Sequence, residues 1–286
     1  MSDQPLVSVI IASYNHAPYI EAAIESVLSQ AYAPIELLVV DDGSTDDSVA
    51  RIQALQRTHG FDFRTQANQG LARTLNDCIA RSRGSLIAPF GSDDVMLPGR
   101  LATQVAYMRD KPEVGICAGN IAHIDGNGAS LSKRDRERAF RRLDFDAVFC
   151  GDQAGAPAPT LLFRREALER VGGFDPSIRL EDLLIELKIT QAGYFIDVLP
   201  DVLAQYRVHG ANTYKNRRFM IETVMATYAR FADHPAYPQV CARFLNSMLL
   251  KCARQDKPLA RELLRQLPLR HWNAKTLRAL GRLLFA

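Results

Sequence analysis

The sequence predicts an α/β protein in which a mostly parallel sheet is flanked by helices and followed by a helical extension. Two observations predict this class. Short apolar runs rich in β-branched residues alternate with segments of helical periodicity, which is typical of strands buried on both faces and joined by crossover helices. From residue 213 onward the pattern is helical and is interrupted by prolines. We therefore expect one domain over residues 1–212 and a helical extension over 213–286.

The first part alternates regularly between strands and helices. It opens with the apolar run LVSVII, after which Ile20, Ile24 and Val27 recur on one helical stripe. The turn between these two segments, ASYNHAPY, has no GxGxxG pattern, which argues against a dinucleotide-binding domain. The expected strands lie at 6–11, 35–40, 61–66 and 85–90, and the expected helices begin near residues 20, 49 and 70.

The second part is less regular. A helix over 100–110 is followed by a short strand at 114–119 and a long polar segment. The remaining expected elements are a strand and a helix within 156–175, a helix over 181–193, and two strands at 194–200 and 202–210.

Composition narrows the class of protein. The chain has 286 residues, 47% of them hydrophobic, and its formal net charge of +3 is too small to indicate a nucleic-acid partner. Its five cysteines are scattered and never form a CxxC pair, so neither a zinc site nor a disulfide framework is expected. The start of the chain lacks a signal-peptide pattern, and no apolar run is long enough to span a membrane. We therefore expect a soluble cytoplasmic protein, which still allows peripheral contact with the inner face of the cell membrane.

Two pairs of aspartates follow strands of the expected sheet. Asp41 and Asp42 come after the second strand, and Asp93 and Asp94 come after the fourth. Ligands of open α/β sheets bind beyond the carboxyl ends of the strands, so we expect one acidic site built from both pairs. Adjacent carboxylates repel each other, and a positively charged group is expected between them.

Seven motifs in one order resemble family 2 glycosyltransferases of the GT-A fold, a Rossmann-like arrangement. They are VSVIIASYN, VVDDGSTDDS, NQGLARTLNDCI, SDD, VGGFD, ED and YRVHG, and they cover roughly residues 5–212. The resemblance implies an inverting transfer of a sugar from a nucleotide-sugar donor, usually with Mg²⁺ or Mn²⁺. A hard divalent cation bound by carboxylate oxygens would neutralise the diphosphate that leaves.

The resemblance assigns the SDD motif to the metal and diphosphate. Asp93 would contact the nucleotide diphosphate and the metal, and Asp94 would serve as a metal ligand. Family members often carry a third acid just upstream, where this chain has Gly91, so the resemblance implies either a weaker metal affinity or Asp94 as the main protein ligand. The alternative is that one of the two acids caps the helix that follows.

The resemblance also assigns the base-binding residues. Asp42 matches the carboxylate that accepts a hydrogen bond from a ring N–H of uracil or thymine, which indicates a UDP- or dTDP-linked donor. Ala12 and Tyr14, in the first turn, would hold the base, and Arg73 would contact the base or the phosphates. A turn or cap residue is the alternative for Asp42.

The ED motif supplies the expected general base. Asp182 would take the proton of the acceptor hydroxyl, and Glu181 is expected to contact the acceptor or a phosphate. In YRVHG, His209 would reach the metal or the diphosphate, and Arg207 would contact a phosphate. The alternatives are ordinary first-turn acids for the ED motif and a structural histidine for His209.

Two basic regions of the sequence each have more than one possible role. The first is either a solvated charged segment or a loop that holds an anionic substrate; its basic residues are Lys133, Arg134, Arg136, Arg138, Arg141 and Arg142. The second is the amphipathic C-terminal stretch 269–286. It would pack on the chain itself, form a homodimer contact, or lie on an anionic membrane.

The expected function is transfer of a sugar to a saccharide or lipid-linked acceptor during synthesis of a cell-surface polysaccharide or lipopolysaccharide. Two other classes are considered. A nucleotidyltransferase would carry a glycine- and lysine-rich phosphate loop near its start, which this sequence lacks. A catalytically inactive nucleotide-sugar-binding or scaffold protein is the second, and Gly91 is the feature that favours it.

Overall fold

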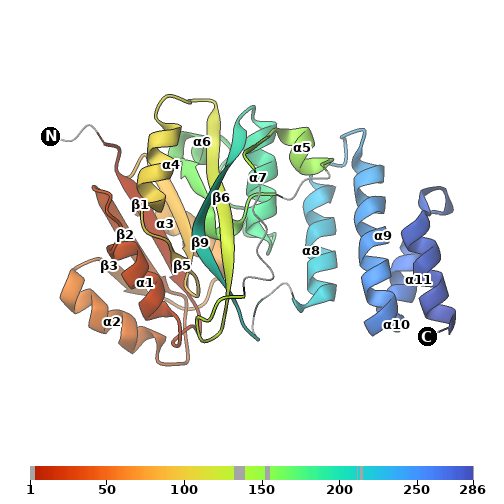
Figure 1. Ribbon diagram of the computed structural model, residues 1–286, viewed down its shortest axis with the longest axis horizontal. Coiled ribbons are helices and arrows are strands. Elements are labelled where there is room, and N and C mark those ends of the chain that lie inside the picture. The colour runs from red at the N-terminus through yellow and green to blue at the C-terminus, as the bar shows by residue number, and fades with distance from the viewer. Residues whose placement is uncertain (1–3, 132–138, 152–154, 211, 213–214, 286) are drawn as a thin grey trace. The chain divides into compact units, whose positions relative to one another are not determined.

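The computed structural model describes residues 4–131, 139–151, 155–210, 212 and 215–285. The chain forms two compact units, Met1–Gly210 and Ala211–Ala286, which are described separately below (Figure 1). The first unit ends at Gly210, two residues before the expected end of the first domain at residue 212.

The first unit is built on one nine-stranded sheet of order β3-β2-β1-β4-β8-β6-β9-β5, with β7 paired to β9. β1 pairs in parallel with β2 and β4, and β2 with β3, so the carboxyl ends of these four strands lie at one edge. β8 runs antiparallel to β4 and β6, while β6 and β9 are parallel. The strands are β1 (Val7–Ser13), β2 (Ile35–Asp41), β3 (Asp62–Thr65), β4 (Leu86–Gly91), β5 (Val95–Met96), β6 (Val114–Asp125), β7 (Arg141–Leu143), β8 (Leu162–Arg164) and β9 (Phe195–Val208).

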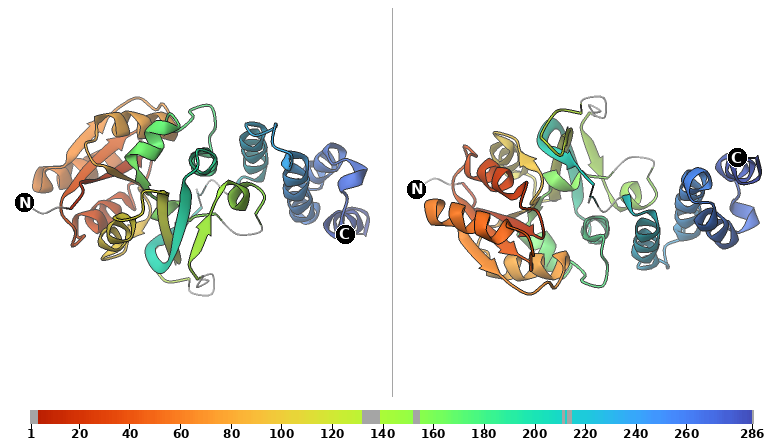
Figure 2. Two further views of the ribbon diagram at one scale, coloured as in Figure 1. Left: turned by 90° about the horizontal axis from the view of Figure 1, so that it is seen from above. Right: turned by 90° about the horizontal axis from the view of Figure 1, so that it is seen from below.

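Helices cover both faces of this sheet (Figures 1 and 2). The helices α1, α2 and α4 bury Ile24, Ile52 and Leu101 in one apolar core, and α3, α6 and α7 bury Leu75 and Ile185, among others, in a second core on the opposite face. The expected α/β class is confirmed. The helices are α1 (Ile20–Leu28), α2 (Ser48–His59), α3 (Leu71–Arg81), α4 (Arg100–Met108), α5 (Phe145–Phe149), α6 (Arg165–Arg170) and α7 (Glu181–Gln191), with a 3₁₀ turn at Ala158–Thr160.

Two strands are longer than expected. β6 continues from the expected strand at 114–119 to Asp125, and β9 is one strand of 14 residues where we expected two. Pro200 suggested a break because it cannot donate a ladder hydrogen bond. The partner strand adapts instead: its register shifts between Ala118 and Asn120, and the Asn120 side-chain amide donates to the Pro200 carbonyl at 2.8 Å. As a result, β9 carries the chain without interruption to the edge where the acidic residues lie.

The second unit is helical, as expected. Its core is built around Leu249, Cys252, Leu263 and Ala279. In the part of the chain that the structure describes, no helix combines the length and apolar character needed to cross a bilayer. The helices are α8 (Arg217–Ala229), α9 (Tyr237–Gln255), α10 (Lys257–Gln266) and α11 (Ala274–Phe285), with a 3₁₀ turn at Leu269–His271.

Candidate active site

The loop after β1 is held in place by the loop after β2. The Asn15 backbone N–H donates to Ser44 Oγ at 2.8 Å, and the His16 backbone N–H donates to Ser48 Oγ at 3.1 Å. Asn15 has a positive φ of 53°, a conformation that asparagine tolerates better than most residues. These bonds fix the position of His16 at the carboxyl edge of the sheet.

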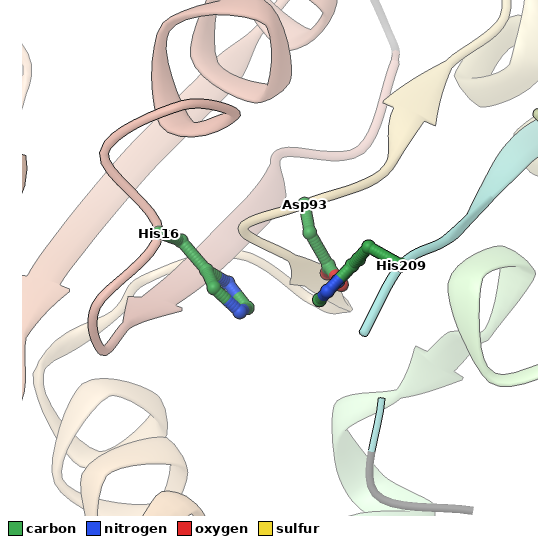
Figure 3. A group of neighbouring side chains, drawn as sticks. All are labelled: His16, Asp93 and His209. Carbon is green, nitrogen blue, oxygen red and sulfur yellow. The ribbon is translucent and has the colours of Figure 1, made fainter. Parts of the chain in front are cut away.

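Three side chains that can bind a metal meet at this edge. His16, Asp93 and His209 come from the loops after β1 and β4 and from the end of β9, and Figure 3 shows them pointing toward one another. Their ligand atoms all lie within 4.8 Å of one another, and His209 Nε2 is 2.8 Å from Asp93 Oδ2. Two imidazoles and one carboxylate form a donor set that suits a first-row divalent ion such as Mn²⁺.

The environment of His16 favours the form that binds a metal. Burial lowers the pKa of the His16 imidazole, an effect that the negative charge of Asp93 opposes. The ring is therefore neutral at neutral pH, as a metal ligand must be. Its Nδ1 forms a hydrogen bond with Ser92 Oγ at 2.7 Å, and this bond fixes the orientation of the ring.

Asp94 lies behind this cluster and does not belong to it. Its side chain is 4% exposed, and its Oδ1 accepts a hydrogen bond from the Arg207 backbone N–H at 2.9 Å. Burial and the negative charge of Asp93 raise the pKa of Asp94 to about 8. This carboxyl faces inward and anchors the end of β9, and its expected role as a metal ligand stays a prediction.

Arg207 is also turned inward. It is 6% exposed, and its guanidinium donates to the backbone carbonyls of Asp93 at 2.7 Å and Asp125 at 3.2 Å. The same guanidinium lies over the ring of Tyr19, which also contacts the His209 ring at a centroid distance of 4.9 Å and the His16 ring at 6.0 Å. Arg207 therefore links the loop after β4 to the end of β6, and its expected contact with a phosphate stays a prediction.

Gly91 has a steric reason to lack a side chain. A Cβ atom at this position would lie 2.7 Å from Asp94 Oδ2 and 3.1 Å from Asp93 Oδ1. Both distances are shorter than ordinary carbon–oxygen contacts, so the two aspartates occupy the space that a third acid would need.

We therefore expect Gly91→Ala to weaken Mn²⁺-dependent nucleotide binding by about tenfold, because the Asp93 carboxylate must move away from the two histidines. Calorimetry of the variant and the parent chain checks this. A suitable control is Gly60→Ala, where nothing lies within 4 Å of the added Cβ, although the positive φ of 72° adds local strain. Equal affinity of Gly91→Ala and the parent would contradict the steric explanation.

Asp42 directly follows β2, and its carboxylate contacts the residues just before α3. Its Oδ1 accepts hydrogen bonds from Gln69 N at 3.0 Å and from the Gln66 side-chain amide at 2.8 Å, and its Oδ2 accepts from Gly70 N at 2.9 Å. These bonds hold the carboxylate rigidly at the carboxyl end of β2. Arg73 is exposed in the first turn of the same helix.

The two other expected base contacts lie at the end of β1. Ala12 is paired with Gly91 across the β1–β4 ladder, which places it beside the loop that carries Asp93. Tyr14 is 49% exposed, so its ring is available to a ligand. The assignment of Asp42, Ala12, Tyr14 and Arg73 to a nucleobase stays a prediction.

Three carboxyl groups lie along α7. Glu181 and Asp182 form its first turn, and Glu186 follows Asp182 by one turn. Burial raises the pKa of Asp182. Burial and the negative charge of Asp182 raise the pKa of Glu181 to about 8 and that of Glu186 well above its ordinary value. Glu181 and Glu186 therefore favour the protonated form at neutral pH.

Two residues of these clusters were not found from the sequence. His16 stands in the turn after the first strand, and its place at the carboxyl edge of a parallel sheet was the signal that could have found it. Glu186 stands among apolar residues in the middle of a helix, where a buried acid is unusual. It accepts a hydrogen bond from the Ala156 backbone N–H and lies near the positive charge of Arg141.

The basic segment is described only at its end. Lys133, Arg134, Arg136 and Arg138 lie outside the described residues. Arg142, in β7, binds the fully buried Asp197 carboxylate through two hydrogen bonds of 2.8 and 2.7 Å. Arg142 therefore has a structural partner, and Arg141 lies near Glu186 of α7.

The fold and the placement of the acidic site define this chain as a glycosyltransferase. The family model described as glycosyl transferase family 2 matches residues 8–172, more than half of the chain. The chain belongs to this family.

Named relatives and a solved structure agree with the assignment. An uncharacterised glycosyltransferase of Nostoc sp. is 31% identical over 261 residues, which cover 86% of this chain and 76% of that protein. The O-antigen biosynthesis glycosyltransferase WbnJ of Escherichia coli is 27% identical over 220 residues, which cover 74% of this chain and 83% of WbnJ.

The mannosyltransferase PcManGT from Pyrobaculum calidifontis, solved in complex with GDP-Man and Mn²⁺, matches with a TM-score of 0.65 at 21% sequence identity. The match covers 99% of this chain and 88% of that one, and it shows that the two chains share the GT-A fold.

Proposed function

We propose that this protein is an inverting glycosyltransferase that moves a sugar from a UDP- or dTDP-linked donor to a saccharide or lipid-linked acceptor. The observation that carries the proposal is the meeting of His16, Asp93 and His209 at the carboxyl edge of the sheet, where GT-A ligands are expected. PcManGT was solved in complex with Mn²⁺ and GDP-Man, which supports the use of a divalent metal and a nucleotide sugar.

The donor set fits the proposed metal. Asp93 supplies a hard carboxylate oxygen, and His16 and His209 supply imidazole nitrogens, a mixture that suits Mn²⁺ better than Mg²⁺. When bound, the cation would neutralise the negative charge that grows on the departing diphosphate. Ser92 and Tyr19 would keep the two imidazoles oriented, through a hydrogen bond to His16 and ring contact with His209.

Asp182 is proposed as the general base. The acceptor hydroxyl oxygen attacks the anomeric carbon from the face opposite the diphosphate, the bond to the diphosphate oxygen breaks, and the hydroxyl proton passes to Asp182. One displacement inverts the anomeric centre. The raised pKa of the Asp182 carboxyl makes it a better proton acceptor than an exposed aspartate, while Glu181 and Glu186 stay neutral beside it.

Asp42 is proposed to read the nucleobase. Its carboxylate is already fixed by three hydrogen bonds and has one lone pair left, on Oδ2, to accept the single ring N–H of uracil or thymine. Tyr14 and Ala12 would flank the base, and Arg73 would approach it or the phosphates. The similarity to WbnJ, an O-antigen biosynthesis glycosyltransferase, supports an acceptor used in synthesis of a cell-surface polysaccharide.

Calorimetry tests the donor class. The protein is titrated with UDP, dTDP, GDP and CMP, each with and without Mn²⁺. We expect UDP or dTDP to bind, and Mn²⁺ to tighten binding by at least about tenfold, because a cation held by Asp93 would offset the negative charge of the diphosphate. Metal-dependent binding of GDP alone would overturn the donor assignment. Failure of the folded chain to bind any of the four would favour a scaffold protein.

A further inference from the structure

Charge is divided unequally between the two units. The unit Ala211–Ala286 has 14 lysines and arginines against four aspartates and glutamates, a net charge of +10. The rest of the chain has 21 against 28, a net charge of −7. The modest total of +3 therefore conceals a strongly basic helical unit.

The helix α11 presents two different faces. Its inner face buries Thr276 and Ala279 and packs Leu283 against the core of the unit. Its outer face carries Leu277 and Leu284, which are 64% and 74% exposed and lie two turns apart on one side of the helix. The core of this unit is closed without these two leucines.

Basic side chains accompany the exposed leucines. Arg278 follows Leu277 in α11, about 100° around the helix, and both side chains are exposed. The exposed Lys275 and Arg282 lie farther around the helix, and Arg282 Nη1 donates to the Leu250 carbonyl at 3.0 Å. The 3₁₀ turn that precedes α11 repeats the pairing of leucine and arginine, with Leu269 75% exposed beside the exposed Arg270. We call the exposed side chains of Leu269, Arg270, Leu277, Arg278 and Leu284 the C-terminal basic face.

We propose that the C-terminal basic face binds the surface of an anionic phospholipid bilayer. Basic side chains gain electrostatic attraction to acidic headgroups, and leucines beside them gain from entering the acyl boundary. A nucleic acid or another soluble polyanion would use the charges and leave the leucines in water. A twofold contact between two copies would bring these like charges together, which is unfavourable.

Vesicle sedimentation of the full chain tests this proposal. We expect binding to vesicles of phosphatidylcholine mixed with phosphatidylglycerol, loss of binding at high salt, and no binding to phosphatidylcholine alone. The double variant Leu277→Gln/Leu284→Gln should lower the partition coefficient by about tenfold, and Arg278→Gln by about fivefold. Leu28→Gln and Arg57→Gln, at exposed positions of the first unit, are the matched controls and should bind like the parent chain.

Three outcomes would overturn the proposal. The first is absence of binding to anionic vesicles by a chain that still binds nucleotide. The second is binding that the leucine pair does not change while heparin competes fully, since that describes a general polyanion surface. The third is a dimer in vesicle-free solution that Leu277→Gln/Leu284→Gln dissociates. None of them depends on which sugar the enzyme transfers.

Discussion

Replacing Asp93 by Asn should abolish Mn²⁺-dependent donor binding and lower kcat/KM by about a thousandfold, or roughly 4 kcal/mol of transition-state stabilisation. Asparagine keeps the shape of the side chain but removes the only carboxylate among the three converging ligand atoms. The two histidines alone would leave the positive charge of a cation uncompensated. Titration with UDP or dTDP in the presence and absence of Mn²⁺, together with steady-state kinetics, measures both effects.

The matched control for this change is Asp110→Asn, at an exposed position just after α4. It removes one negative charge from the same unit and should leave binding and turnover unchanged. If Asp93→Asn still bound nucleotide more tightly with Mn²⁺ than without it, the metal would be held elsewhere, and the cluster of His16, Asp93 and His209 would lose its proposed role.

Asp182→Asn should lower kcat by about a thousandfold while donor affinity changes by less than about twofold. The amide cannot accept the hydroxyl proton, yet it keeps the size of the carboxyl and its hydrogen bond from Leu183 N. Glu186→Gln is the control because it lies one turn away on the same helix, holds its proton at neutral pH and can still accept from Ala156. Loss of donor binding in Asp182→Asn, or full activity, would contradict the assignment of the base.

The same residue sets the expected pH dependence. Burial raises the pKa of Asp182, and the base must be ionised to act, so activity should fall with decreasing pH at a higher pH than for an exposed aspartate. In the pH profile of kcat/KM, this acidic limb should persist in Glu186→Gln. It should be absent from the residual activity of Asp182→Asn.

Much of the fold follows from local patterns in the sequence. The runs that form β1, β2 and β4 are apolar and β-branched, and the aspartates that follow them fall at the edge that parallel pairing dictates. The strand β9 was divided in error because Pro200 is a local signal against a strand. The shift of register in β6 that accommodates this proline is a property of the pair of strands and is not visible in either one.

The sequence predicted some of the residues of the site, but it could not predict the direction in which each side chain points. Asp93 and Asp94 are neighbours, so sequence alone cannot say which points outward; the structure sends Asp93 to the two histidines and Asp94 to the Arg207 backbone. His16 was missed because its partners, Asp93 and His209, are brought to it by contacts between distant strands. Glu186 was missed because its burial depends on the chain around Ala156.

The position of His209 along the chain has a consequence for anyone who wishes to study the catalytic unit alone. His209, a proposed metal ligand, is the residue before Gly210, at which the first unit ends. A chain shortened to this unit would therefore be cut directly beside His209. A new carboxylate terminus beside it would add a negative charge and the freedom of a loose end to a site that depends on a fixed imidazole. Weak metal binding by such a fragment would therefore be a consequence of the truncation and would not describe metal binding by the intact enzyme.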